Sequence, residues 1–165
     1  MSIHIRPASP DDAEALAHIL NAIIAAGAYT AMDTPFTAED EREYIATFPS
    51  NGVFCVAESA DQGIVGCQTL EPFATYTHAF DHVYIVGTHV DLGHRGQGIG
   101  TRLSEVAFEL ARQKGCEKIF SYVRADNRLA LAFYLKLGFR IVGTAQRQAK
   151  INGKYIDEII IERFL

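Results

Sequence analysis

The sequence of 165 residues has no run of lysine or arginine and no segment that approaches eighteen apolar residues. The missing basic run, together with a formal net charge of −5, argues against a nucleic-acid-binding scaffold. The missing apolar segment excludes a membrane-spanning helix, and the opening MSIHIRPAS lacks the apolar core of a signal peptide. We therefore expect a cytoplasmic protein that has neither nucleic acid nor membrane among its partners.

Metal and disulfide signals are also missing. Cys55, Cys67 and Cys116 form an odd set with no C-x-x-C spacing, and the first two fall in apolar strand patterns. Buried, reduced thiols are the expected state. The histidines outside the central strand show no metal-ligand spacing, so no metal site is predicted at His4, His18, His78, His82 or His94.

What is present is the length and patterning of one domain, residues 1–165. Helices are predicted over 10–26, 37–48, 101–112 and 127–137, with Ser9 as the N-cap of the first, Gly27 as its end and Thr37 opening the second. Strands are predicted over 3–5, 53–58, 64–70, 83–90, 118–123, 139–143 and 155–161, with Asn152-Gly153 as the hairpin turn before the last one. This order contains one strand–helix–strand crossover. It predicts an α/β fold, a single-domain mixed and mostly antiparallel sheet with helices on both faces.

The chain is organised around residues 83–112, where a β-rich strand leads through a glycine-rich turn into an amphipathic helix. The turn contains Gly93, Gly96, Gly98 and Gly100. Glycines let backbone N–H groups turn inward, and the N-terminus of a helix adds partial positive charge. A strand, a glycine turn and a helix together indicate a site for a diphosphate group.

The spacing of these glycines excludes two common diphosphate sites. A P-loop needs lysine after its last glycine, and here Thr101 and Arg102 follow Gly100. A dinucleotide-binding fingerprint needs a third glycine where this chain has Thr101. What remains is the run Arg95-Gly96-Gln97-Gly98-Ile99-Gly100.

That run resembles the R/Q-x-x-G-x-G/A motif of the GNAT N-acetyltransferase superfamily. A second stretch, Asn127 to Phe139, resembles the family's N-x-x-A-x-x-F-Y-x-x-x-G-F motif, in the right order and after one intervening strand. The resemblance implies the GNAT acyl-CoA acyltransferase fold and acetyl-CoA as co-substrate. It also implies direct attack of an amine on the thioester in a ternary complex.

The resemblance assigns the cofactor-binding residues in three groups. The loop Arg95, Gly96, Gln97, Gly98, Ile99, Gly100 and Thr101 would wrap the pyrophosphate. The main chain at Thr88, His89, Val90 and Leu92 would bind pantetheine like an added strand. On the second motif, Asn127 and Tyr134 are two helical turns apart and share a face with the small Ala130 between them, with Phe133 adjacent.

The catalytic expectations are of unequal origin. A phenol keeps its proton at pH 7, so Tyr134 can protonate the departing thiolate, the role that the resemblance implies. The main-chain N–H of Val90 would face the acetyl oxygen, by resemblance alone. The base that deprotonates the amine stays open between His89, Glu71, Asp33 and a chain of water molecules.

The acceptor is expected to be a small-molecule amine. In the family, the connection that corresponds to residues 28–36 forms one wall of the acceptor pocket, and the substrate-binding candidates are Tyr29, Thr34, Phe36, Glu71 and Tyr84. The Thr-Pro-Phe-Thr and Asn-Gly-Lys-Tyr-Ile-Asp-Glu segments resemble the phosphinothricin and amino-acid acetyltransferase branch. We therefore expect an amino acid or an analogue such as phosphinothricin.

Two alternatives stay open. One is acetylation of a protein N-terminus or lysine, and the other is an acyl-CoA-binding sensor that transfers nothing. The apolar last strand, from Tyr155 to Phe164, would also allow a homodimer.

Overall fold

Helices and strands follow one another in the predicted order in the computed structural model, which describes residues 2–165. The strands are β1 (Ile3–Pro7), β2 (Val53–Ser59), β3 (Gly63–Pro72), β4 (Val83–Val90), β5 (Lys118–Arg124), β6 (Arg140–Ile151) and β7 (Lys154–Phe164). The helices are α1 (Ala13–Ala26), α2 (Ala38–Ala46), α3 (Ile99–Gln113) and α4 (Arg128–Lys136). Short 3₁₀ turns cover Pro10–Asp12, His78–Phe80 and Leu92–His94.

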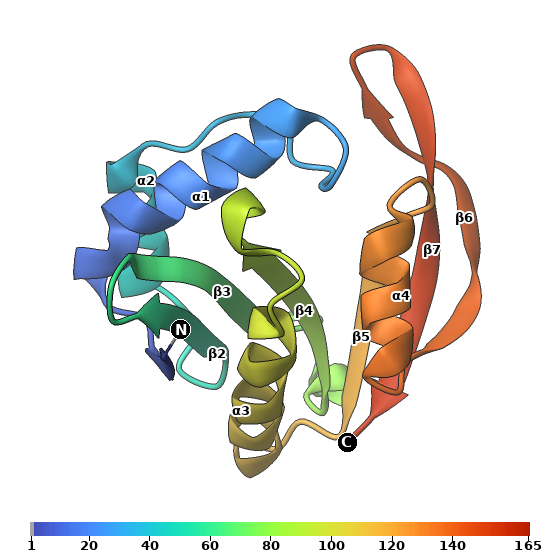
Figure 1. Ribbon diagram of the computed structural model, residues 1–165. Helices are drawn as coiled ribbons and strands as arrows, with labels where there is room; N and C mark the ends of the chain where they lie inside the picture. Colours follow the sequence, from blue (N-terminus) through green and yellow to red (C-terminus); the bar gives the residue numbers. More distant parts are fainter. Residues whose placement is uncertain (1) are drawn as a thin grey trace.

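The strands form one sheet in the order β1-β2-β3-β4-β5-β7-β6. Every neighbouring pair is antiparallel except β4 and β5, which are parallel and joined through α3. Figure 1 shows α1 and α2 on one side of the first strands, with α3 below and α4 beside β5. The mixed, mostly antiparallel sheet that the sequence predicts is confirmed.

Alternation along β2 shows why helices cover both faces. Val53, Cys55 and Ala57 point into a core with α3 residues. Phe54 and Val56 pack with Leu16 of α1, with Ile45 of α2 and with Phe48, which follows α2. A strand buried on both sides reads as a continuous apolar run, as 53–57 does. The prediction of helices on both faces is confirmed.

The helix ends follow the predicted signals. Gly27 ends α1 at φ 72°, a left-handed conformation that glycine adopts without a side-chain clash. Thr37 caps α2 by accepting a hydrogen bond from the Asp40 N–H, and the Asp40 carboxylate accepts from the Thr37 N–H in return. These local bonds fix where the connection 28–36 begins and ends.

The C-terminal hairpin differs from the prediction in length. Strand β6 runs to Ile151 instead of ending at residue 143, because the chain crosses two register shifts and then resumes pairing with β7. Arg147 lies in the second irregular stretch at φ 52°. Asn152 and Gly153 form the predicted turn with φ of 50° and 77°.

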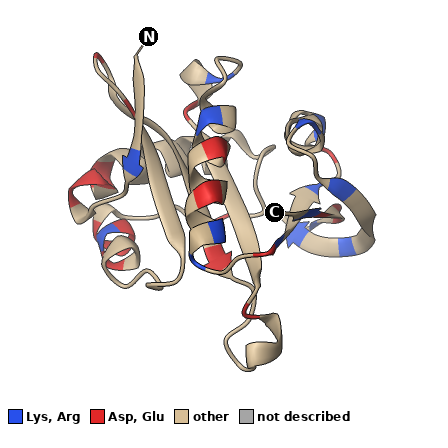
Figure 2. Ribbon diagram, turned by 90° about the horizontal axis from the view of Figure 1, so that it is seen from below, with Lys and Arg blue, Asp and Glu red and all other residues tan. Residues whose placement is uncertain are grey.

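Charge is divided between the two ends of the sheet. Helix α2 carries four acids and one arginine, whereas β6 carries three basic residues and no acid. Figure 2 shows this division, with red on the N-terminal helices and blue along the last hairpin. Helix α2 is therefore more acidic than strand β6 at the far edge of the sheet.

The three cysteines are buried and free, as predicted. Within residues 2–165, no group of histidine, cysteine or acidic side chains is placed to hold a metal ion. In the same range, no helix has the length and apolar character needed to cross a membrane.

Candidate functional site

Strands β4 and β5 separate after three paired residues, and this divergence organises the site. Only Val83–Ile85 pair with Lys118–Phe120, whereas β4 continues beside β3 to Val90. The Asp91 N–H donates to the Val65 carbonyl of β3. Since N–H groups alternate along a strand, those of Thr88 and Val90 point away from β3, to the side where β5 has left.

The glycine turn presents an open backbone at the end of β4. Gly96 and Gly98 have φ of 75° and 77°, and no atom lies within 4 Å of where a Cβ would stand on either one. Gly98 is the N-cap of α3, so no side chain stands before the first free N–H groups of that helix. This cradle fits a pyrophosphate group, which backbone N–H groups and a helix N-terminus bind.

The other predicted loop residues lie around this cradle. Gln97 and Thr101 are exposed, and Leu92 is 38% exposed. The Ile99 side chain is buried in the core, so only its main chain can face a ligand. Gly100, unlike Gly96 and Gly98, has little space around it, because a Cβ there would lie 3.0 Å from the Phe133 ring. The small residue lets α3 approach α4.

Tyr134 lies on α4 with its side chain inside the core and is 7% exposed. Its hydroxyl donates to Thr88 Oγ1 over 3.0 Å, which places the phenol beside the free edge of β4. Burial raises the pKa of Tyr134 to about 12, against a smaller lowering by the bond to Thr88. The group therefore holds its proton at neutral pH and can donate it.

A polar chain that the sequence analysis missed supports Thr88. The Gln68 Nε2 donates to Thr88 Oγ1 and to Ser104 Oγ, each over 2.8 Å, and Ser104 donates to the Gly100 carbonyl. Gln68 is fully buried, and its Oε1 has no hydrogen-bond partner among the described residues. The only sequence signal was a glutamine within the apolar run 64–70.

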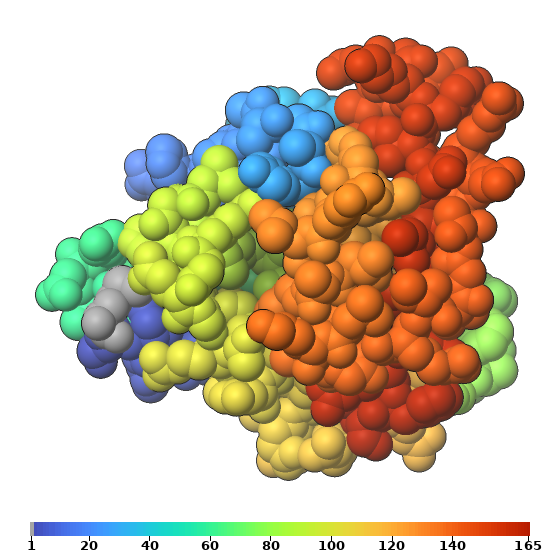
Figure 3. All heavy atoms as spheres, turned by 45° about the vertical axis from the view of Figure 1, so that its right-hand side comes forward, coloured from blue at the N-terminus to red at the C-terminus, as the bar shows by residue number. Residues whose placement is uncertain are grey.

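The predicted acceptor loop contacts the predicted cofactor residues. The guanidinium of Arg95 lies 4.0 Å above the Tyr29 ring, and Asn127 Nδ2 donates to the Tyr29 carbonyl over 3.2 Å. Asn127 also caps α4 through the Ala130 N–H. Figure 3 shows the loop after α1, the glycine segment and α4 meeting on one face of the molecule.

Arg124, at the end of β5, hydrogen-bonds the start of the predicted acceptor loop, a role that the sequence did not predict. Its buried guanidinium donates to the Gly27 and Thr30 carbonyls over 3.1 and 2.9 Å and pairs with Asp126 at 2.7 Å. The paired carboxylate raises the pKa of Arg124, so the charge is permanent. The end of β5 thereby fixes the start of the predicted acceptor loop.

A cavity of about 340 Å³ lies on the face covered by α1 and α2. Its walls come from both helices, the loop 27–36 and strands β2 to β4, and it is lined by Leu20, Met32, Phe36, Asp40, Glu41, Tyr44, Phe54, Cys67, Thr69 and His89. Of the predicted acceptor residues, Phe36 lines it. Asn21 fixes Phe36 by bonding its N–H and its carbonyl, both over 2.8 Å.

The base candidates have different surroundings. His89 lines the cavity, and burial, with a smaller effect of Arg95, lowers its pKa to about 4. Glu71 accepts a hydrogen bond from the Tyr44 hydroxyl over 2.7 Å. Asp33 is exposed and accepts from the neighbouring Thr34 hydroxyl. Of the three, His89 is the one that lines the cavity.

Two predicted acceptor residues lie away from that cavity. Tyr84 is 1% exposed and donates its hydroxyl to the Asn51 carbonyl over 2.7 Å, because its side chain points to the α3 face of β4. Thr34 is exposed and bonds only within its own loop. The structure therefore gives Tyr84 a packing role and does not bring it to the acceptor side.

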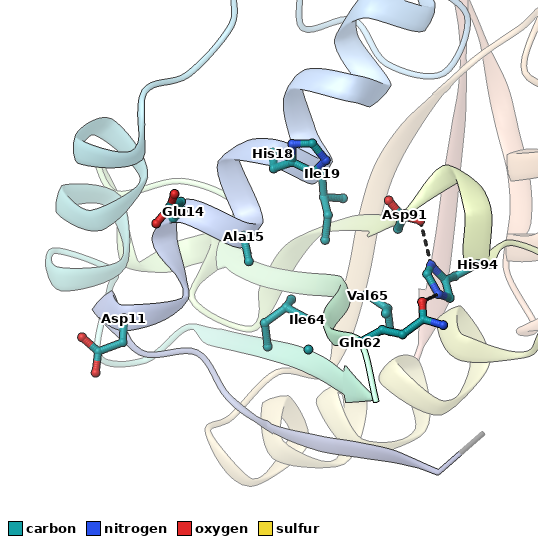
Figure 4. A pocket seen from close by; sticks show the side chains of 11 residues that line it. Asp11, Glu14, Ala15, His18, Ile19, Gln62, Ile64, Val65, Asp91 and His94 are labelled. Carbon is teal, nitrogen blue, oxygen red and sulfur yellow. Dashed lines mark hydrogen bonds and ion pairs between the residues drawn. The ribbon is translucent and has the colours of Figure 1, made fainter. Parts of the chain in front are cut away.

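A second cavity lies between α1, the β2–β3 turn and the end of β4. Figure 4 shows Asp91 and Gln62 on either side of the His94 imidazole, with Nδ1 2.7 Å from Asp91. His18 and Glu14 line the α1 side of this open depression. It is separate from Tyr134 and from the α2-side cavity, so it adds nothing to the site.

The sequence profile of the acetyltransferase (GNAT) family matches residues 19–139, a range that contains the glycine turn, α4 and every residue that lines the 340 Å³ cavity. YwnH of Bacillus subtilis, provisionally named a phosphinothricin acetyltransferase, is 28% identical over 161 residues and covers 98% of both chains. The phosphinothricin N-acetyltransferase of Streptomyces coelicolor is 24% identical over 164 residues, covering 98% of this chain and 95% of its own.

Solved structures share the fold. A GNAT superfamily phosphinothricin acetyltransferase from Sinorhizobium meliloti, crystallised with AcCoA, superimposes with a TM-score of 0.91 and 20% identity, covering 100% of this chain and 89% of its own. At this identity the comparison establishes the architecture alone.

Proposed function

The chain belongs to the acetyltransferase (GNAT) family, and from this premise we propose that it transfers the acetyl group of acetyl-CoA to the primary amine of a small molecule. The observation that carries the proposal is the divergence of β4 and β5. On the α3 side of β4 lie the glycine cradle and Tyr134, and on the α1 side lies the cavity with His89. The free edge of β4 lies between donor and acceptor.

Acetyl-CoA supplies the activated thioester, and the residues of this chain position it and manage protons. The N–H groups of Gly96 to Thr101 are available for the pyrophosphate, and the free edge of β4 for pantetheine. Tyr134 holds the proton that the leaving thiolate needs. The Val90 N–H is oriented to stabilise negative charge on the acetyl oxygen.

The amine loses its proton to water rather than to a strong base. With a pKa of about 4, the His89 imidazole is neutral at pH 7. It can accept a hydrogen bond from the amine, but it is too weak a base to take the proton. Glu71 already binds the Tyr44 hydroxyl, and Asp33 lies in solvent. Water at the cavity mouth then carries the proton away, while His89 orients the nitrogen.

Transfer is direct, without an acetylated enzyme. The cysteine that lines the cavity, Cys67, has its pKa raised to about 12, mainly by burial, so its thiol stays protonated and is a poor nucleophile. The neutral amine attacks the thioester carbon, the carbon–sulfur bond breaks, and the Tyr134 proton goes to sulfur. The nitrogen loses its second proton to solvent as the amide forms, and solvent returns one proton to Tyr134. The overall reaction releases one proton from the original ammonium group.

The acceptor is compact because the cavity is small and one wall is the aromatic ring of Phe36, whose backbone is held by Asn21. Full-length relatives named for phosphinothricin support an amino-acid analogue as the acceptor.

A homodimer through the last strands is supported by the exposure of Ile141, Val142 and Phe164, which are 48%, 49% and 64% exposed. Three free cysteines support a reducing compartment such as the cytoplasm.

An acceptor screen tests the proposal. Thiol release from acetyl-CoA is followed with amino acids, phosphinothricin, other amino-acid analogues, polyamines, aminoglycosides and peptides. We expect turnover with one or more compact primary amines. Turnover on peptide N-termini or lysines alone would assign protein acetylation, and acetyl-CoA binding without any thiol release would assign a sensor.

A further inference from the structure

Glu41 is a buried carboxylate without a partner. It belongs to α2, lines the 340 Å³ cavity and is 3% exposed. No hydrogen bond or ion pair joins its side chain to any residue between 2 and 165, and its carboxylate oxygens keep some accessible surface. Burial raises the pKa of Glu41, as expected for a carboxylate that is partly desolvated and not compensated.

The other acids of the same helix are all accounted for. Glu39 is ion-paired with Arg42, and Asp40 accepts the N-cap hydrogen bond of Thr37. Glu43 is exposed to solvent. Of the acids on α2, Glu41 is the one that is turned inward and left unpaired. A carboxylate in this position is costly unless a cation joins it.

The cavity supplies no such cation. Its ionisable groups other than Glu41 are Asp40, Tyr44, Cys67 and His89, and no lysine or arginine side chain lines it. His89 is neutral at pH 7, and burial keeps Tyr44 and Cys67 protonated. None of the described residues that line the cavity therefore balances the charge of Glu41, whereas a cationic ligand would.

We propose that Glu41 is the ammonium-binding residue of the acceptor site, where it pairs with the protonated primary amine as the acceptor enters the cavity. The inference rests on the proposed acetyl transfer, because that reaction requires a primary amine in this cavity. An ammonium group has three N–H donors for the two carboxylate oxygens. The aromatic side chains of Phe36, Tyr44 and Phe54 surround the rest of a compact acceptor.

Matched substitutions on α2 test the assignment. Glu41→Gln keeps the shape of the side chain and removes its charge, and Glu43→Gln removes an exposed charge from the same helix. Initial rates are measured with phosphinothricin, L-methionine and 2-phenylethylamine. In Glu41→Gln the acceptor KM should rise at least tenfold while the acetyl-CoA KM stays within twofold. Glu43→Gln should match wild type in both.

Thermal unfolding gives a readout that is independent of turnover. Without amine at neutral pH, Glu41→Gln should melt at or above the wild-type temperature, because the unpaired charge is gone. A purely structural role for Glu41 predicts a lower melting temperature. Added 2-phenylethylamine or phosphinothricin should raise the melting temperature of wild type and Glu43→Gln, and not that of Glu41→Gln.

The outcomes separate this inference from the proposed function. An unchanged acceptor KM in Glu41→Gln, or equal amine-induced stabilisation of all three proteins, overturns the role of Glu41 and leaves acetyl transfer intact. Amine-induced stabilisation that depends on Glu41, with no thiol release from any amine, supports Glu41 and overturns the proposed reaction.

Discussion

The Tyr134 hydroxyl donates to Thr88 Oγ1 over 3.0 Å, and this bond joins α4 to the free edge of β4. Thr88 Oγ1 also receives a hydrogen bond from Gln68 Nε2. With both acceptor positions in use, the Thr88 proton is free, and it can turn to the phenol oxygen when Tyr134 gives its own proton to sulfur. The bond thus aligns the acid before reaction and stabilises it afterwards.

Removing the Tyr134 hydroxyl should affect the chemical step and not binding. Tyr134→Phe keeps the ring that packs against Phe133 and Phe139. We expect kcat to fall by roughly 10²–10⁴, the usual range for loss of a general acid. Acetyl-CoA affinity measured by titration calorimetry should stay within about fivefold, since one hydrogen bond is worth roughly 1 kcal/mol. Wild-type turnover in the variant would place the acid elsewhere.

Thr88 should act through Tyr134. Thr88→Val removes the partner of the phenol and of the Gln68 amide, at a cost of about 0.5–1.5 kcal/mol for each hydrogen bond, or roughly 2- to 12-fold in kcat. Thr88→Ser keeps the hydroxyl and should restore the rate. The hydrogen bond to Thr88 lowers the pKa of Tyr134. Loss of this bond should therefore shift the alkaline limb of the kcat–pH profile to higher pH. An unshifted profile with a slow variant would indicate simple misfolding.

The sequence predicted the element order because the local signals agree with the final contacts. The glycine spacing, the caps at Ser9 and Thr37 and the Asn152-Gly153 turn all act over a few residues, and all have the predicted conformation. The β6 extension was missed because its pairing with β7 crosses irregular positions that interrupt the alternation. Such a strand is defined by its partner rather than by its own pattern.

The parts of the site that depend on local sequence were predicted, and those that depend on distant contacts were not. The phosphate cradle is a local motif, whereas the cavity is built from α1, α2 and β2 to β4, which meet only in the fold. One signal for Glu41 was available, because it precedes Tyr44 and Ile45 by three and four residues and so shares their inner face. Gln68 and Arg124 bind segments that lie far away in the sequence, and a glutamine within the apolar run 64–70 marks Gln68 as unusual without indicating its partners.

The glycine cradle should be testable without affecting the rest of the fold. Gly98→Val places a β-branched residue at φ 77°, where the strain of about 1–3 kcal/mol distorts the loop. Acetyl-CoA affinity by calorimetry should fall more than roughly tenfold, equivalent to about 1.4 kcal/mol. Gly63→Val is the matched control, since Gly63 has φ 73° and an equally open surrounding in the β2–β3 turn. Equal losses of affinity in both variants would reject the cradle as the pyrophosphate site.

Acid stability should depend on Asp12. Its carboxylate is 6% exposed and pairs with Arg6 at 2.8 Å, and this hydrogen bond lowers its pKa. A lowered pKa stabilises the folded state above the unfolded value of about 4, and that stability is lost as the pH falls through the folded value. Asp12→Asn should cost about 1–3 kcal/mol at pH 7. The gap in melting temperature between the two proteins should shrink below about pH 4, and a gap that stays constant down to pH 2 would contradict the ion pair.

Phe36 should control the acceptor and not acetyl-CoA. Its ring forms one wall of the cavity, and Asn21 hydrogen-bonds both the N–H and the carbonyl of Phe36, so the backbone that carries the ring is held before the acceptor arrives. Phe36→Ala removes apolar contact worth about 1–3 kcal/mol, so the acceptor KM should rise roughly 10- to 200-fold. The acetyl-CoA KM should stay near wild type, because the glycine cradle lies on the other face of β4. Phe164→Ala, at a position 64% exposed on the last strand, is the control for general loss of aromatic surface. If both KM values rise in parallel in Phe36→Ala, the ring supports the whole site. That result would reject the cavity as the acceptor-binding site.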